Sequence, residues 1–256
     1  MVLILSKPIH INHSSMSSGI LWGHWIYTKG TGLPRIRNLK KYMLCGNRYL
    51  PSKYRAKGDE PTRYGDETMR VLETARLTLR PFAERDFDAV HAYASDAANV
   101  QYLLWGPNDE AQTRAFLTHA IDKSQEKNPC TDYQFAVEQR TSGILIGACN
   151  LSINADEAEI GWILHRNYWR QGFGTEIANR LLKFGFAELG LHRLTAHCDA
   201  ENLGSQRLMD RIGMRREGCF LEGRPANKFS NQKYGDEYSY AILSAEWKAL
   251  SPLKRQ

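Results

Sequence analysis

The chain has 256 residues, of which 42% are hydrophobic and 24% are charged, and these fractions are ordinary for a globular protein. No apolar run approaches the roughly 18 residues that cross a bilayer, and Met1–Leu5 is too short for a secretory signal. The composition therefore excludes a membrane-spanning protein, and we expect no contact with a membrane.

The cysteines and the charge distribution narrow the expectations further. The five cysteines are odd in number and scattered without a C-x-x-C pair, so we expect a reducing, cytoplasmic location and no disulfide framework. The net charge of +6 is divided unevenly along the chain. Residues 1–68 hold 11 basic and 4 acidic residues, or +7, whereas the other 23 basic and 24 acidic residues give −1.

The first 68 residues show no helical or strand periodicity and are rich in Gly, Ser, Pro and Asn. We predict an irregular, basic N-terminal extension over residues 1–68 and a folded domain over residues 69–256. A basic arm permits weak, non-specific contact with RNA or with a ribosome. The alternative, which the sequence leaves open, is that synthesis starts at Met69 and that the extension has no function.

Strands and helices alternate after Met69. Alternating leucines predict a strand over Arg76–Phe82, and apolar residues at helical spacing predict a helix over Glu84–Ser95. Further along, the patterns predict a helix over Asp109–Lys127, a hairpin of Tyr133–Glu138 and Ile144–Leu151, and a strand over Ala158–Leu164.

Five more elements complete the predicted domain. An apolar stripe that includes Ile177 and Leu181 predicts a long helix over Gly172–Leu189. The patterns then predict a strand over His192–Cys198, a helix over Asn202–Ile212, and strands over Arg215–Leu221 and Tyr234–Leu243. Because strands outnumber helices and the two are mixed, we expect an α/β or α+β fold with a mixed central sheet.

The segment Tyr168–Glu176 (YWRQGFGTE) carries the most specific chemical signal, because it follows a predicted strand and opens the apolar-striped helix. Gly172 and Gly174 have no Cβ, so the backbone can approach a ligand closely. The first helical turn then offers free N–H groups to a pyrophosphate. A tight strand–helix connection without a ligand would show the same two glycines. The sequence here is neither a dinucleotide fingerprint nor a P-loop.

Other motifs stand in order around this segment. Upstream lie Glu73–Pro81 (ETARLTLRP) and Glu159–Trp162 (EIGW), and downstream lie Asn202–Met214 (NLGSQRLMDRIGM) and Asp236–Leu243 (DEYSYAIL). Together these segments resemble the acetyl-CoA-binding core of the GNAT N-acetyltransferases, in particular the branch of the ribosomal-protein alanine N-terminal acetyltransferases. The resemblance covers about residues 72–250. It implies a GNAT fold, with a central sheet of six or seven strands and about four helices.

The resemblance also implies a direct transfer of an acetyl group from acetyl-CoA to a primary amine, without an acetyl-enzyme. The backbone of Ile163 and Leu164 would bind the pantetheine arm and the thioester oxygen. Asn202 would bind the pantetheine amides or would simply cap its helix. The pyrophosphate would be held by the turn and the helix start, with contacts drawn from Arg170, Gln171, Gly172, Phe173, Gly174 and Thr175.

Two residues are the candidate catalytic groups. Glu159 is the candidate general base, acting through water, because a carboxylate beside an apolar pocket has a raised pKa; a solvated strand residue is the alternative. Ser205 could donate a proton to the departing sulfur, although serines on helix surfaces are usually inert. We interpret His197 as structural. No His/Cys grouping has zinc spacing, so we expect no metal.

The acceptor stays open at this stage. The first expectation is a protein N-terminal α-amine of the ribosomal-protein type, and the second is a small amine such as a polyamine or an aminoglycoside. A third interpretation, from a different class, is a non-catalytic module that senses acyl-CoA while its basic arm binds RNA. Both a monomer and a homodimer fit the sequence.

Overall fold

The computed structural model describes residues 70–125, 131–226 and 229–250. The predicted extension over residues 1–68 and its boundary with the domain lie outside the described residues, so both stay predictions.

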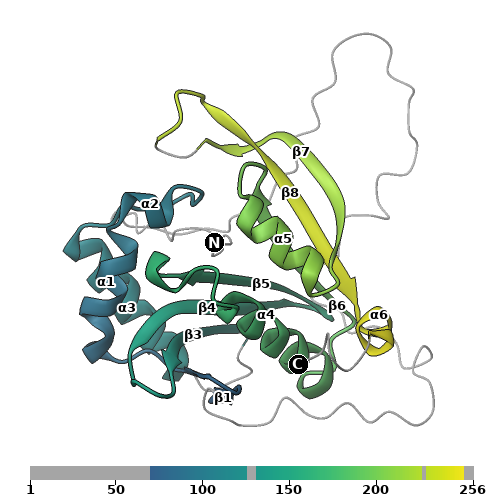
Figure 1. Ribbon diagram of the computed structural model, residues 1–256, viewed down its shortest axis with the longest axis horizontal. Coiled ribbons are helices and arrows are strands. Elements are labelled where there is room, and N and C mark those ends of the chain that lie inside the picture. Colours follow the sequence, from purple (N-terminus) through teal and green to yellow (C-terminus); the bar gives the residue numbers. More distant parts are fainter. Residues whose placement is uncertain (1–69, 126–130, 227–228, 251–256) are drawn as a thin grey trace, which may run out of the picture. The chain divides into compact units, whose positions relative to one another are not determined.

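An eight-stranded mixed sheet forms the centre of the described domain (Figure 1). Its strands lie side by side in the order β1-β2-β3-β4-β5-β6-β8-β7. β5 and β6 pair in parallel, whereas the other neighbouring strands of this sheet pair antiparallel. The strands are β1 (Leu72–Glu73), β2 (Leu77–Arg80), β3 (Asp132–Gln139), β4 (Leu145–Asn154), β5 (Glu157–Leu164), β6 (Arg193–Asp199), β7 (Arg215–Pro225) and β8 (Tyr234–Leu243).

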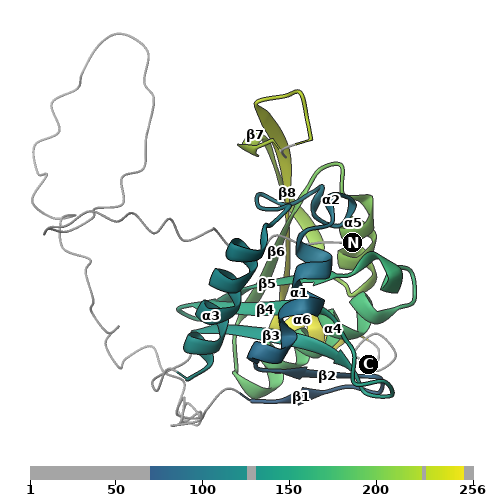
Figure 2. The same cartoon turned by 90° about the vertical axis from the view of Figure 1, so that its left-hand side faces the viewer.

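Helices cover both faces of this sheet (Figure 2). One face carries α1 (Phe87–Ala94), α2 (Ala97–Val100) and α3 (Glu110–Gln125). The opposite face carries α4 (Phe173–Lys183) and α5 (Leu203–Arg211), and α6 (Ser244–Ala249) follows β8. α4 lies between β5 and β6 in the chain and makes the crossover that a parallel pair requires.

Two apolar clusters result, one on each face of the sheet. The larger cluster packs the stripe of α4, including Ile177 and Leu181, against Trp162 of β5. The smaller cluster packs Val90 of α1 against Ile163 of β5. Successive residues of a strand point to opposite faces, so β5 must be apolar on both sides. This explains why its second half is an unbroken apolar run rather than an alternating one.

The expected mixed α/β sheet is confirmed, with eight strands instead of six or seven. The additional strand is β1, which has two residues, and two of the helices beyond the predicted four are α2 with four residues and α6 with six. Elements this short cannot show a period in the sequence. The helix predicted over Gly172–Leu189 is α4 followed by a π-helical turn, Phe184–Glu188.

Candidate active site

The parallel pair β5 and β6 separates partway along its length. Their pairing covers three residue pairs and ends where Glu159 lies opposite Thr195. β5 continues to Leu164 while it pairs with β4, and β6 continues to Asp199 while it pairs with β8. The hydrogen-bond ladder between β5 and β6 is therefore open beyond Glu159. Free strand edges of this kind can bind an extended ligand through its amides.

One backbone donor points into this open ladder. The carbonyl oxygen of Ile163 lies against β4, because a Cβ added to Gly147 would come within 2.1 Å of it. The Leu164 N–H is the other end of the same planar, trans peptide, so it points away from β4 toward the open side. The N–H of Ile163 itself faces β4 by the alternation of the strand. Of the two predicted backbone groups, Leu164 is the one that presents its N–H to the opening.

Two side chains fix the end of β5. The carbonyl oxygen of Leu164 accepts hydrogen bonds from Trp169 Nε1 at 2.8 Å and from Asn99 Nδ2 at 3.0 Å. Asn99 of α2 is fully buried, and its Oδ1 accepts a hydrogen bond from the Arg166 N–H at 2.7 Å. α2 and the YWRQGFGTE segment therefore hold the last peptide of β5 in one orientation.

The glycine turn has the backbone geometry that an anion site needs. Gly172 precedes α4 with a φ of 82°, a left-handed conformation that suits a residue without a Cβ. Phe173 and Gly174 are buried at the start of α4, and Thr175 is half-buried. The first N–H groups of a helix have no partners within the helix. They also mark the positive end of its dipole, where a diphosphate is stabilised.

The two polar residues before Gly172 differ in their surroundings. Arg170 is exposed and has a φ of 60°. Gln171 is exposed too, but its Nε2 donates to the Asn167 carbonyl at 2.8 Å and its own carbonyl accepts from Arg76 Nη1 at 3.1 Å. The side chain of Gln171 therefore stabilises the turn itself.

Asn202 and Ser205 lie at the start of α5. Asn202 is 1% exposed, and its Oδ1 accepts a hydrogen bond from the Ser205 N–H at 3.1 Å. The helix-capping role that we considered for Asn202 is thus present in the structure. Ser205 is fully buried in the first turn of α5. The cofactor and proton-transfer roles of these two residues stay predictions.

Glu159 shares its surroundings with titratable groups from two other strands. Burial is the main cause that raises the pKa of Glu159; His197 opposes this rise, and the carboxylate of Glu237 adds to it. His197 Nδ1 lies 3.9 Å from Glu237 Oε2. A carboxylate with a raised pKa is suited to removing a proton near neutral pH. His197, which we interpreted as structural, belongs to this group of three side chains.

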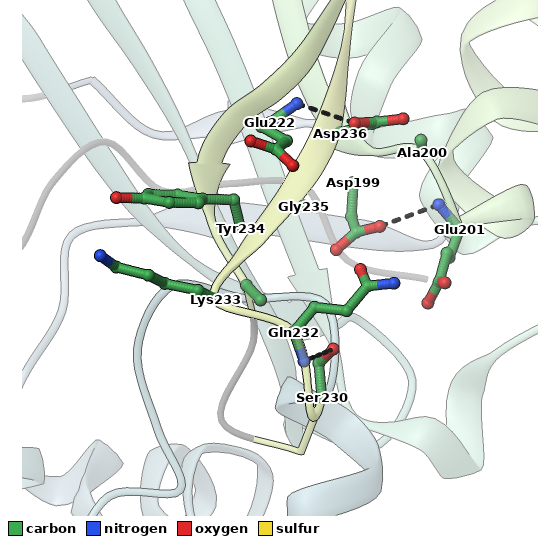
Figure 3. A pocket seen from close by; sticks show the side chains of 11 residues that line it. Asp199, Ala200, Glu201, Glu222, Ser230, Gln232, Lys233, Tyr234, Gly235 and Asp236 are labelled. Atoms are coloured by element: carbon green, nitrogen blue, oxygen red, sulfur yellow. Dashed lines mark hydrogen bonds between the residues drawn. The ribbon is translucent and has the colours of Figure 1, made fainter.

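A second group of carboxylates lines a pocket of about 580 Å³ between the end of β6 and the β7–β8 hairpin (Figure 3). Asp199 of this pocket lies opposite Glu237 in the β6–β8 pairing, so the pocket adjoins the Glu159 group. Lys233 is the basic residue in the lining. The carboxylates in the lining are Asp199, Glu201, Glu222 and Asp236.

One buried arginine ties this pocket to the rest of the domain. Arg224 of β7 is 3% exposed, and its Nη1 lies 3.1 Å from Asp199 Oδ2. Its Nη2 donates to the carbonyl oxygen of Tyr102, in the connection between α2 and α3, at 3.2 Å. Arg224 thereby joins the β7–β8 hairpin to the end of β6 and to the α2–α3 connection.

Within the part of the chain that the structure describes, a metal site, a membrane-spanning helix and a reactive cysteine find little support. There, no cluster of three or more His, Cys, Asp or Glu side chains could hold a metal ion. The described helices include none that is long and apolar enough to span a membrane. Burial raises the pKa of Cys149 far above its usual value and that of Cys198 to about 12, so both stay protonated thiols.

Three residues of this site, Asn99, Arg76 and Glu237, were not predicted from the sequence. Asn99 and Leu164 are 65 positions apart in the chain, and Arg76 and Glu176, which form an ion pair, are 100 apart. No local spacing could reveal such pairs. The available signals were Arg76 within the ETARLTLRP segment and the acidic start of the DEYSYAIL segment.

Comparison with known proteins identifies the family. The model of the acetyltransferase (GNAT) domain matches residues 76–215, which is more than half of the chain. The uncharacterised N-acetyltransferase YnaD of Bacillus subtilis strain 168 is 37% identical over 178 residues, which are 69% of this chain and 98% of the relative. The crystal structure of a GNAT-family acetyltransferase from Bacillus anthracis is 35% identical, with a TM-score of 0.61, and covers 69% of this chain and 100% of its own.

A more distant relative is named spermidine N(1)-acetyltransferase of Vibrio cholerae, and it is 23% identical over 68% of this chain and 96% of its own length. The family match includes both the open β5–β6 ladder and the glycine turn. Enzymes of this family use acetyl-CoA. The chain therefore belongs to the GNAT acetyltransferase family and is an N-acetyltransferase.

Proposed function

We propose that the chain transfers an acetyl group from acetyl-CoA directly to a primary amine that carries further positive charge. The observation that carries this proposal is the open ladder beyond Glu159, with the Leu164 N–H on one side and the glycine turn at its end. Acetyl-CoA supplies an acyl carbon activated as a thioester. The amine nitrogen attacks this carbon, the carbon–sulfur bond breaks, and the thiolate takes up a proton.

The chain's own residues divide the binding work. The first N–H groups of α4, from Phe173 to Thr175, hold the diphosphate, with Arg170 as an additional cation. The edge of β5 hydrogen-bonds to the pantetheine arm, and Asn202 lies at the start of α5 to contact the same arm. The Leu164 N–H donates to the carbonyl oxygen as negative charge develops on it, which is where a fixed donor lowers the barrier most.

Glu159 removes the proton that the amine nitrogen loses, through a water molecule. Its raised pKa follows from burial and from Glu237, and both features favour accepting a proton at neutral pH. Ser205 is the candidate donor of a proton to the departing sulfur.

The charge around Glu159 favours a cationic acceptor. Glu159 and Glu237 lie on the same face, and four carboxylates line the adjoining pocket. A cleft lined by one sign of charge concentrates substrates of the opposite sign. The relative from Vibrio cholerae, named for its action on spermidine, supports a polyamine-like amine, and an aminoglycoside has the same chemistry.

A protein N-terminal α-amine is the second candidate. The motifs from Tyr168–Glu176 and Asp236–Leu243 favour it through their resemblance to the ribosomal-protein alanine branch. The same acidic face would accept a protonated N-terminus.

An acceptor panel tests both candidates. Release of coenzyme A thiol and the mass of the product are measured with spermidine, an aminoglycoside and a peptide that begins with alanine. We expect kcat/KM for a polycationic small amine to exceed that for the peptide by about tenfold or more, because of the acidic face. Preference for the peptide would favour the second candidate. If none of the three acceptors caused thiol release, the proposed acceptor class would be contradicted.

Three further points remain proposals: contact of residues 1–68 with RNA or a ribosome, a cytoplasmic location, and the choice between monomer and homodimer. The charge of the arm supports the first of these. Comparing RNA affinity and turnover of the full chain with those of residues 69–256 tests it, and unchanged values would show that the arm has no role.

A further inference from the structure

Arg76, in the short connection between β1 and β2, contacts three parts of the glycine turn and of the helix that follows it. Its Nε donates to Glu176 Oε2 at 2.7 Å, and its Nη1 donates to the Gln171 carbonyl at 3.1 Å. Its guanidinium carbon lies 4.3 Å from the centre of the Phe173 ring. A Cβ added to Gly172 would lie 3.3 Å from its Nη2. The guanidinium is therefore fixed against the segment that holds the diphosphate.

Glu176 carries a full negative charge in the first turn of α4. Burial alone would raise the pKa of Glu176, but hydrogen bonds from Thr74 and Arg76 and the charge of Arg76 outweigh burial, so the pKa lies below its usual value. Its Oε1 accepts from Thr74 Oγ1 at 2.6 Å and from the Arg76 N–H at 2.8 Å. An ionised carboxylate in this turn stabilises the helix, but it also opposes a second anion at the same helix end.

We propose that Arg76 is a positioning residue of the diphosphate site: its guanidinium neutralises Glu176 and holds the glycine turn, so that α4 presents net positive potential to coenzyme A. This inference rests on the proposed role of the glycine turn in cofactor binding. It adds a residue that lies 100 positions away from the turn, and it assigns opposing electrostatic effects to Arg76 and Glu176.

A double-mutant cycle separates this role from a purely structural one. The full chain is prepared as wild type, Arg76→Gln, Glu176→Gln and the double variant, and each is titrated calorimetrically with coenzyme A and with pantetheine, which lacks the diphosphate. Arg114→Gln is the matched control, because Arg114 also forms an exposed ion pair, with Glu110, and also stacks on a ring, that of Phe87. It lies on α3, which covers the opposite face of the sheet from α4.

Arg76→Gln is expected to weaken coenzyme A binding about five- to tenfold, because it leaves a carboxylate unbalanced in the first turn. Pantetheine binding should change less than about twofold, since pantetheine carries no charge to be repelled. The double variant should recover most of the lost affinity, because it has no uncompensated charge. Arg76→Lys, which retains the charge without the planar fork, should stay close to wild type even if Arg76→Gln folds poorly.

Two results would overturn the inference while wild type still binds coenzyme A. One is an equal loss of coenzyme A and pantetheine affinity in Arg76→Gln. The other is a double variant as weak as Arg76→Gln. Absence of coenzyme A binding by wild type is a different outcome, because it would contradict the proposed function itself and the inference with it.

Discussion

Substituting Gly147 by alanine tests whether the Leu164 N–H contributes to catalysis. The added Cβ would lie 2.1 Å from the carbonyl oxygen of Ile163 and 2.9 Å from Leu164 Cα, whereas ordinary contacts begin at 3.4 Å. The two nearest obstructing atoms are backbone atoms, so no side-chain rotation relieves the contact. The Ile163–Leu164 peptide must therefore move away by about 1.3 Å, the difference between the 3.4 Å of an ordinary contact and the 2.1 Å to the Ile163 oxygen.

A displacement of about 1 Å in a positioned catalytic group can cost on the order of 100-fold in rate. We expect Gly147→Ala to lower kcat by about this factor at saturating acetyl-CoA, measured as thiol release with the best acceptor. Gly218→Ala is the matched control, because its Cβ would meet no atom closer than 3.5 Å. A folded Gly147→Ala enzyme whose kcat stays within about threefold of wild type would refute the reasoning.

Three further variants test the base, the end of β5 and the buried ion pair. Because the pKa of Glu159 is raised, kcat/KM of the wild type should rise with pH through that pKa. Glu159→Gln should abolish this rise and lower the plateau of kcat/KM about 100-fold. A rise that persists in Glu159→Gln would exclude Glu159 as the base. Asn99→Leu removes both hydrogen bonds that Asn99 makes at the end of β5. It should lower the free energy of unfolding, measured with urea, by about 2 kcal/mol. An unchanged value would contradict the role of Asn99 in holding the end of β5. Asp199→Asn leaves the charge of Arg224 buried without its partner and should lower the free energy of unfolding by about 3 kcal/mol. Arg215→Gln, which breaks an exposed ion pair, should lower it far less. Equal losses in the two variants would contradict this expectation.

Sequence patterns predicted the elements whose periodicity is long enough to be read. The strand predicted over Tyr234–Leu243 has the bounds that the structure shows, and the stripe with Ile177 and Leu181 located α4. β5 was also recognisable, because burial on both faces makes its second half an unbroken apolar run. By contrast, β1 was visible only through its pairing with β2, and α2 through the bond of Asn99 to the end of β5. Two or four residues cannot show the pattern that would reveal them.

The candidate site was predictable where it depends on the local backbone. The glycines of the YWRQGFGTE segment predicted a turn that opens a helix, and the structure shows that turn before α4, with Gly172 in a left-handed conformation. The orientation of the Leu164 N–H follows from the pairing of β5 with Gly147 and its neighbours on β4, and the lowered pKa of Glu176 depends on Thr74 and Arg76. These properties arise only when distant segments pack together, so no motif spacing encodes them.

The central claim is that the glycine turn and the open β5–β6 ladder bind acetyl-CoA. Titrating the full chain with acetyl-CoA, by calorimetry and by the shift in melting temperature, tests it most directly. We predict one saturable site per chain and a raised Tm, because a ligand at 100 times its Kd stabilises the folded state by about 2.7 kcal/mol. Neither heat nor a change in Tm at millimolar acetyl-CoA would contradict the claim.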